Sequence, residues 1–219
     1  SYLDLSWPEM RQIAGDQGLL PHLHRPERLV LAPGDRVDAE WLIGETGFEV
    51  RNGAWSLNGG PSYEESMPVV EVVVDEPAPE PIPLAWPFTG ARVSLDPMYT
   101  DIFLTMTGSD RTGIWLMNGE RFPNVTVDAL TLGQEAIIEV RNLSPTEHPF
   151  HLHGLDFEVL SINGVPPPYA MIEDTINLRI RDQVRLKVLA ENPGFWMAHC
   201  HILPHAHDGM MTVIEVKAP

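Results

Sequence analysis

Apolar and polar residues alternate along several short stretches in the second half of the chain. Ile176-Asn-Leu-Arg-Ile180 and Val184-Arg-Leu-Lys-Val188 have an apolar side chain at every second position, which is the period of a strand with one buried face. Shorter apolar runs end at turn signals such as Asn118-Gly119; they lie at 102–106, 114–117, 157–162 and 211–216. Because no helical period extends beyond two turns, the pattern predicts an all-β Greek-key sandwich.

The first part of the chain has the same character but fewer strands. Residues 1–76 contain four or five strand-like runs, such as Leu29-Val-Leu31 before the Pro33-Gly34 turn. A sandwich of this kind needs about seven strands, and half a sandwich exposes unpaired edges. Either the missing strands lie upstream or another chain completes the domain. We favour the first, and expect 1–76 to be a partial domain. The alternation of proline with other residues predicts an extended linker at 77–86, followed by one complete domain at 87–219.

Composition excludes some classes of partner. The 219 residues carry a formal net charge of −17, which argues against nucleic acid and anionic membranes as partners. The same acidity would attract cationic substrates weakly, or would simply keep a secreted protein soluble. One cysteine permits no intrachain disulfide, and no apolar run has the length of a membrane span.

Two histidine-rich stretches contain the candidate chemistry. They are His148-Pro-Phe-His151-Leu-His153-Gly154 and the segment from His199-Cys200-His201 to Met210. Together they hold seven of the nine histidines and the only cysteine. Thiolate and thioether sulfur beside imidazole nitrogen is a ligand set that suits copper.

Strand geometry predicts how these ligands divide. If 199–201 is extended, Cys200 points to one side of the strand and His199 and His201 point to the other. The same rule places His151 and His153 on a common face. The four imidazoles of these two pairs could then bind a metal cluster. The remaining candidate ligands could form a separate mononuclear site; they are His148, Cys200, His205 and Met210.

The two motifs, in this order, resemble the C-terminal copper motifs of the multicopper oxidases, the laccase-like enzymes. Asn118-Gly119, Asp174-Thr175 and the Gly194-Phe-Trp-Met segment add to the similarity, and GDQGLLP with LVLAPGDRVD resembles the second half of the middle domain of three-domain members. The resemblance implies cupredoxin-like folding of both units. It also implies a type 1 copper held by His148, Cys200, His205 and Met210, a type 2 ligand at His151, and type 3 ligands at His153, His199 and His201.

The function that the resemblance implies is that of a copper-dependent oxidase. Single electrons would leave a phenolic, aromatic or metal-ion reductant such as cuprous copper at the type 1 site. They would pass through Cys200, His199 and His201, the catalytic residues, to a trinuclear cluster that reduces dioxygen to water. The complete protein would hold about four copper ions and be periplasmic or extracellular. Since the cluster of the family uses eight histidines and this chain offers four, we expect little dioxygen reduction without the missing N-terminal region.

Two alternatives remain open at this point. The chain could be a blue-copper electron-transfer or copper-binding module without oxygen chemistry, or, more remotely, a structural sandwich without metal. Copper stoichiometry of about four per complete chain, one or none separates these possibilities. We expect His22 and His24 to lie in a surface loop and His207 to be solvated or to support a ligand. Ala206 occupies the position where many bacterial members carry an acidic residue, so the proton-delivery group stays unassigned.

Overall fold

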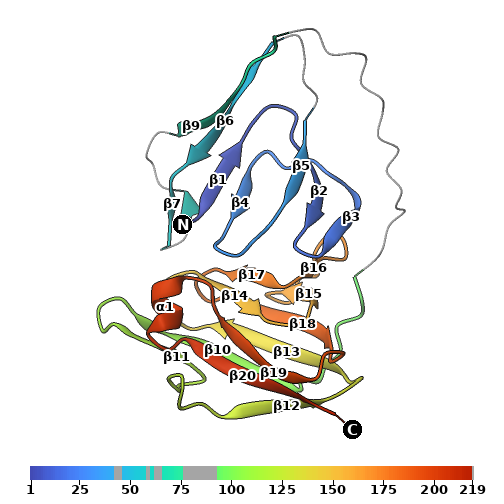
Figure 1. Cartoon of the computed structure of the whole chain (residues 1–219), viewed down its shortest axis with the longest axis vertical. Coiled ribbons are helices and arrows are strands. Elements are labelled where there is room, and N and C mark those ends of the chain that lie inside the picture. The colour runs from blue at the N-terminus through green and yellow to red at the C-terminus, as the bar shows by residue number, and fades with distance from the viewer. Residues whose placement is uncertain (42–45, 58–59, 62–65, 76–92, 219) are drawn as a thin grey trace.

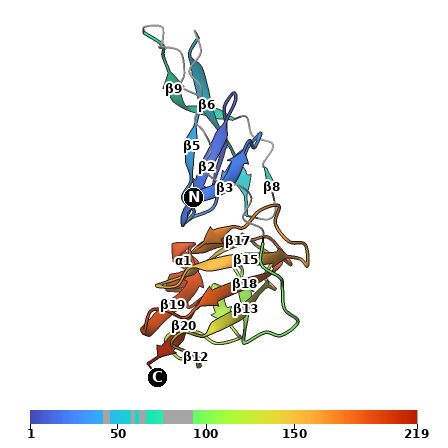
Figure 2. The ribbon, with the colours of Figure 1, turned by 90° about the vertical axis from the view of Figure 1, so that its right-hand side faces the viewer.

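A computed structural model of the chain describes residues 1–41, 46–57, 60–61, 66–75 and 93–218. The expected linker at 77–86 lies outside these residues. The N-terminal strands form one unit that lies against a second, larger unit formed by the C-terminal strands (Figures 1 and 2). No helix of the described part is long and apolar enough to cross a membrane.

The N-terminal unit contains more strands than the sequence pattern predicted. It has a four-stranded sheet in the order β4-β1-β6-β9, a three-stranded sheet in the order β3-β2-β5, and a small β7–β8 ladder. Several of these strands have only two to four residues, too few to show a clear alternation. Their bounds are β1 Leu3–Ser6, β2 Arg11–Gly15, β3 Gly18–His24, β4 Leu29–Leu31, β5 Asp38–Glu40, β6 Phe48–Gly53, β7 Trp55–Ser56, β8 Gly60–Pro61 and β9 Met67–Val72.

The C-terminal unit is a sandwich of two sheets, in the orders β11-β10-β13-β18-β15-β16 and β12-β20-β19-β14-β17. The expected all-β sandwich is confirmed. The strands are β10 Ile102–Ser109, β11 Ile114–Met117, β12 Val127–Thr131, β13 Glu135–Asn142, β14 His148–Leu152, β15 Phe157–Ile162, β16 Ile172–Glu173, β17 Thr175–Leu178, β18 Gln183–Leu189, β19 Gly194–Cys200 and β20 Met211–Lys217.

The hydrophobic core lies between these two sheets. Its largest fully buried side chains include Phe150, Phe157 and Leu186, and burial of each such side chain contributes about 1.5–3 kcal/mol to stability. The alternation in 184–188 is borne out, because Val184, Leu186 and Val188 are buried and the intervening residues are half-buried. Strand β12, Val127–Thr131, pairs in parallel with β20.

One short helix interrupts the strands of the described part. Helix α1, Leu203–His207, follows β19, begins with Pro204 in its first turn and ends before Gly209. Gly209 has a φ of 115°, a conformation open to glycine that commonly ends helices. Because Cys200 N–H donates to Met210 O and Met210 N–H donates to His205 O, this helical turn returns the chain to the end of β19.

Candidate metal centres

The register between β14 and β19 separates the candidate ligands into two groups. Phe150 lies opposite Cys200, and His151 lies opposite His199. Directly opposed residues share a face of the sheet and neighbours along a strand do not. Consequently His148 and Cys200 face the core side of the sheet, whereas His151 and His199 face the other side.

Three ligand atoms converge on the core side. The distance from Cys200 Sγ to His148 Nδ1 is 3.4 Å, that from Cys200 Sγ to His205 Nδ1 is 3.8 Å, and the two Nδ1 atoms are 3.2 Å apart. All three residues are buried. Met210 is fully buried as well and is joined to Cys200 and His205 through its backbone hydrogen bonds.

The loop before β14 determines which nitrogen of His148 faces the sulfur. Ser144 Oγ lies 2.6 Å from His148 Nε2 and donates its own proton to Asn142 Oδ1 or Thr146 O. The hydroxyl oxygen is therefore the acceptor of the His148 Nε2–H. This leaves the lone pair of Nδ1 directed at Cys200 and His205, the arrangement that a metal-binding imidazole requires.

Electrostatics in this buried group suit a cation. Burial, together with His205, lowers the pKa of His148 to about 3, and burial raises the pKa of the Cys200 thiol to about 12. Burial also lowers the pKa of His205, so both imidazoles are neutral at neutral pH, and the thiol keeps its proton until a cation displaces it. Two neutral imidazoles and one thiol fit a copper ion of the His2Cys kind.

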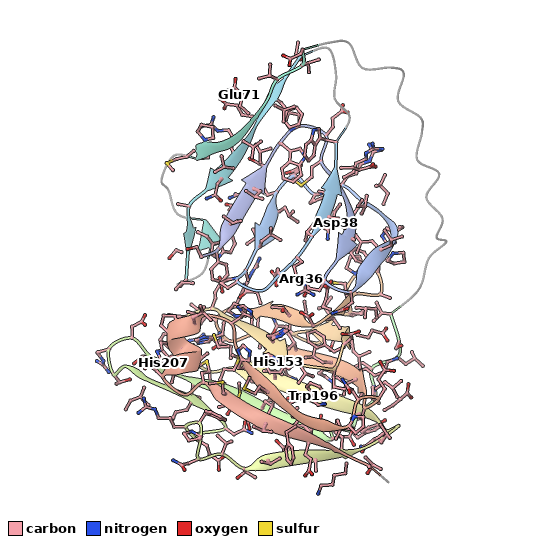
Figure 3. The ribbon with its side chains drawn as sticks, viewed as in Figure 1. Arg36, Asp38, Glu71, His153, Trp196 and His207 are labelled. Carbon is pink, nitrogen blue, oxygen red and sulfur yellow. The ribbon has the colours of Figure 1, made fainter. Side chains whose placement is uncertain are left out.

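A second group of imidazoles lies on the opposite face of the sheet. Suitable ligand atoms of His151, His153 and His199 lie within 4.8 Å of one another, and His153 Nε2 is 2.9 Å from His199 Nε2. His153 is half-buried at this face (Figure 3). The ring of His201 is farther out, with its centroid 5.5 Å from that of His151 and 5.7 Å from that of His199.

Hydrogen bonds orient two rings of this second group. His151 Nδ1–H donates to Asp174 O at 2.9 Å, with Thr175 Oγ1 at 3.0 Å, and His199 Nδ1–H donates to Cys200 O at 2.8 Å. Each ring then presents Nε2 to the cluster. Burial lowers the pKa of His199 to about 4, so this donor is also neutral.

The N-terminal unit holds the segment that orients His151. Arg36 binds both carboxylate oxygens of Asp174, at 2.9 and 2.6 Å, and Asp16 accepts hydrogen bonds from the backbone N–H groups of Arg36 and Thr175. Arg36 lies at the junction of the two units (Figure 3). Burial acts to raise the pKa of Asp174, but the hydrogen bonds from Arg36 and Thr175 lower this pKa to about 2.

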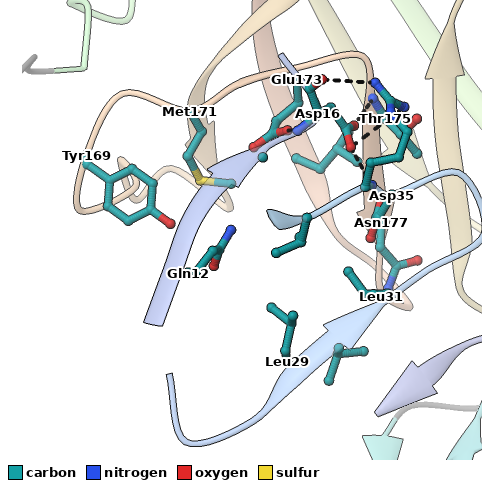
Figure 4. Close-up of a pocket in the computed structure, with 15 residues that line it drawn as sticks. Gln12, Asp16, Leu29, Leu31, Asp35, Tyr169, Met171, Glu173, Thr175 and Asn177 are labelled. Carbon is teal, nitrogen blue, oxygen red and sulfur yellow. Dashed lines mark hydrogen bonds and ion pairs between the residues drawn. The ribbon is translucent and has the colours of Figure 1, made fainter. Parts of the chain in front are cut away.

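Carboxylates gather beside this junction. A cavity of about 210 Å³ is lined by Asp16, Asp35 and Glu173, together with apolar residues of both units (Figure 4). Burial and the neighbouring carboxylates raise the pKa of Glu173 to about 8, and burial raises that of Asp35 to about 7. Glu173 also accepts a hydrogen bond from the Asp16 N–H. These acids belong to the contact between the units.

A second contact from the N-terminal unit reaches the residue next to His148. Glu147 is fully buried; its N–H donates to Leu57 O, and its carboxylate accepts hydrogen bonds from Trp55 Nε1 and Asn177 Nδ2. Asn177 in turn accepts from the Tyr2 hydroxyl. The N-terminal unit therefore contacts residues adjacent to ligands of both candidate groups.

The remaining histidines lie apart from both groups. The expectation that His22 and His24 occupy a loop is wrong: both belong to β3, where their rings pack against Tyr169 at 4.8 and 5.7 Å between centroids. Pro21 made the segment resemble a turn, but an edge strand tolerates proline, and β3 is at the edge of its sheet. His207 is exposed on α1 (Figure 3), as expected.

Several residues that support the ligands were not identified from sequence. Arg36 reaches Asp174 only after distant strands pack together, whereas Ser144 lies four residues before His148, in the loop that precedes β14. Asp174-Thr175 was recognised as a motif, but its hydrogen bonds to His151 were not. Only the polar loop before His148 gave a local signal.

Comparisons with known proteins agree with this geometry. The sequence model of a family described as multicopper oxidase matches residues 96–219. A multicopper oxidase of Staphylococcus epidermidis is 38% identical over 107 residues, covering 46% of this chain and 24% of that protein. The multicopper oxidase MmcO of Mycobacterium tuberculosis is 30% identical over 115 residues, covering 52% and 22%.

Solved structures extend the similarity to both units. A multi-copper oxidase from Pediococcus acidilactici superposes with a TM-score of 0.80 at 26% identity, covering 100% of this chain and 46% of that one. A multicopper oxidase from Campylobacter jejuni, at 24% identity, shows the shared fold with a TM-score of 0.83, over 100% and 51%. The chain thus spans about a quarter of its curated relatives and about half of these structures. The cupredoxin-like fold is confirmed, and the chain belongs to the multicopper oxidase family.

Proposed function

We propose that this chain is the C-terminal portion of a copper-dependent oxidase that takes single electrons from a reductant and delivers them to dioxygen. His148, Cys200, His205 and Met210 would hold the type 1 copper. His151 would bind the type 2 copper, and His153, His199 and His201 the type 3 pair. Copper bound at these sites would supply the one-electron steps that reduce dioxygen to water.

The residues of the chain have distinct tasks in this proposal. The Cys200 thiol gives up its proton on metal binding and supplies the soft donor of the first site. Ser144 keeps His148 in the tautomer with a free Nδ1, and Asp174 and Thr175 do the same for Nε2 of His151. Because Cys200 is bonded to His199 and His201, one tripeptide joins the two sites.

The observation that carries the proposal is the opposite orientation of neighbouring ligands on β19. Cys200 Sγ is 3.4 Å from His148 Nδ1, whereas the adjacent His199 places Nε2 2.9 Å from His153 Nε2. A simple electron-transfer module needs only the first group. The second group favours oxygen chemistry over that alternative.

The domain organisation predicted from sequence is part of the proposal. Residues 1–76 would belong to a domain completed by strands outside this chain, and the missing region would supply the other cluster histidines. Support comes from β9, an edge strand whose residues 67–71 are all exposed. The isolated chain should therefore reduce little dioxygen. A periplasmic or extracellular location stays a prediction.

The identity of the reductant is proposed only by class. Relatives are described as laccase, as L-ascorbate oxidase and as iron transport multicopper oxidase, so small organic molecules and metal ions are both represented. The net charge of −17 favours cationic over anionic reductants through long-range attraction.

Copper loading of a Cys200→Ser variant tests the function. We expect the wild-type chain to bind copper with strong visible absorption from the thiolate–copper bond, and Cys200→Ser to lose that absorption. His153→Ala is the matched control, because His153 belongs to the other group and its loss should leave the absorption in place. Strong blue absorption in Cys200→Ser, or none in wild type, would contradict the assignment.

A further inference from the structure

One aromatic side chain of β11 covers the buried ligand group. Trp115 of β11 is only 2% exposed. Its ring is stacked on His205, with 3.8 Å between centroids and 26° between planes. It also meets His148 edge-on, at 5.2 Å and 77°. The indole is thus in contact with both imidazoles whose Nδ1 atoms face Cys200.

Glycine leaves room for the indole at this position. Gly108 lies opposite Trp115 in the β10–β11 hairpin, and a Cβ atom there would lie 2.6 Å from Trp115 Cε3. Its φ of 138° also disfavours other residues. On the far side, a Cβ atom at Gly209 would lie 3.2 Å from the Trp115 carbonyl oxygen. The close fit fixes the ring at the ligand group.

The ring of His205 has weaker polar contacts than the ring of His148, so the indole matters more for its orientation. Ser144 holds Nε2 of His148 at 2.6 Å. Among the described residues, Nε2 of His205 has only the exposed carboxylate of Asp110 nearby, at 3.9 Å, beyond hydrogen-bond distance. His205 also comes from a helix of five residues rather than from a sheet. Stacking on Trp115 is the contact that holds the plane of the ring.

We propose that Trp115 is a positioning residue of the type 1 site: it fixes the plane of His205 and keeps water from that face, which raises the reduction potential. The proposal rests on the proposed function. With a bound thiolate, a divalent copper leaves a net charge of +1 and a monovalent copper leaves none. Exclusion of water disfavours the charged oxidised state, so the indole favours the reduced state.

The test compares Trp115→Leu and Trp115→Phe with Trp196→Phe in the copper-loaded 219-residue chain. Trp196 packs on the same core and bonds through Nε1 to Asn192 O, so it controls for general loosening. The measurements are the reduction potential by mediated titration, the position of the visible band, copper affinity by chelator competition, and the melting temperature of the apoprotein.

Trp115→Leu should lower the reduction potential, shift the visible band and weaken copper binding by roughly 10–100-fold, the usual effect of losing a residue that supports a ligand. Trp115→Phe keeps an aromatic face and should show smaller changes in the same direction. Trp196→Phe should lower the melting temperature and leave potential and band at wild-type values.

Wild-type potential and band in Trp115→Leu would overturn the proposal. If that variant does not fold, the same result in Trp115→Phe would overturn it. A raised potential, or equal changes in Trp196→Phe, would also overturn it. Failure of the proposed function is distinguishable, because the wild-type chain itself would then show no thiolate–copper band.

Discussion

At the scale of single residues, hydrogen bonds decide which imidazole nitrogen is free for a metal. Backbone carbonyls accept Nδ1–H of His151 and His199, whereas a hydroxyl accepts Nε2–H of His148. The two ligand groups therefore present different nitrogens, Nε2 in the cluster and Nδ1 beside the cysteine. The sequence motifs cannot reveal this difference, because they show only that each ligand is a histidine.

Ser144→Ala should weaken copper binding at the first group. Without its hydroxyl, His148 Nε2–H loses its nearest partner at 2.6 Å, and the tautomer with a free Nδ1 is no longer favoured. We expect a loss of affinity of roughly 10–100-fold, measured by competition with a copper chelator.

Ser161→Ala is the matched control for this prediction. Ser161 is similarly buried and donates one hydrogen bond to Asp96 at 2.7 Å, and it lies on β15, in the sheet opposite the one that contains β14 and β19. Both variants should lose about 1–3 kcal/mol of stability. Equal copper affinity in the two variants would show that Ser144 has no special role.

At the scale of elements, the turns of the N-terminal unit bind the β16–β17 bend of the sandwich. Arg36 and Asp16 bind Asp174 and Thr175, and Glu173 lies in the cavity beside them (Figure 4). Glu173 is half-buried in this contact beside other carboxylates, which disfavour its ionised form. The strength of the contact should consequently depend on pH.

Glu173→Gln should reduce the pH dependence of stability between pH 4.5 and 8. Burial and neighbouring acids raise the pKa of Glu173 from 4.5 to about 8 in the folded protein, so the folded state keeps a proton that the unfolded state has lost. Stability then falls as pH rises through this window, by at most about 1.4 kcal/mol per pH unit, and the fall ends above the folded pKa.

Denaturant unfolding at a series of pH values measures this slope. The glutamine variant should have a flatter profile than wild type. Glu71→Gln, which changes an exposed carboxylate on β9, should leave the profile unchanged. An identical slope in Glu173→Gln and wild type would show that Glu173 is not protonated in the folded chain.

At the scale of the whole molecule, the two units differ in how well they are covered. The sandwich of 93–218 surrounds its own core, whereas β9 at the edge of the N-terminal unit exposes Val69 and Val70 at 49% and 51%. An uncovered apolar edge strand pairs readily with other chains.

Val70→Lys should reduce self-association of the isolated chain, because a charge on an open edge opposes pairing. Light scattering over a concentration series measures the effect. Val165→Lys changes another exposed valine, in a turn of the sandwich, and should not alter association. If both variants associate as wild type does, β9 is not the contact.

The sequence by itself determined the all-β class, the main strands of the sandwich and the grouping of His148 with Cys200 and His205 and of His151 with His153 and His199. Strand alternation is a local property of the backbone, so His199 and Cys200 had to point to opposite sides once 199–200 was extended. Leu29–Leu31 was predicted and forms β4. The two-residue strands β7 and β8 and the strand position of His22 were missed, because two residues give too little periodicity and Pro21 suggests a turn.

Only the tertiary structure decided what supports the ligands. Trp115 lies 90 residues before His205, and Arg36 lies 138 residues before Asp174, so no local pattern could connect them. Their contacts arise when β11 packs beside α1 and when one unit docks on the other. Alternation along a strand is fixed by covalent geometry, so the sequence was enough to predict it. Contacts between distant elements depend on how the whole core packs, so only the structure could reveal them.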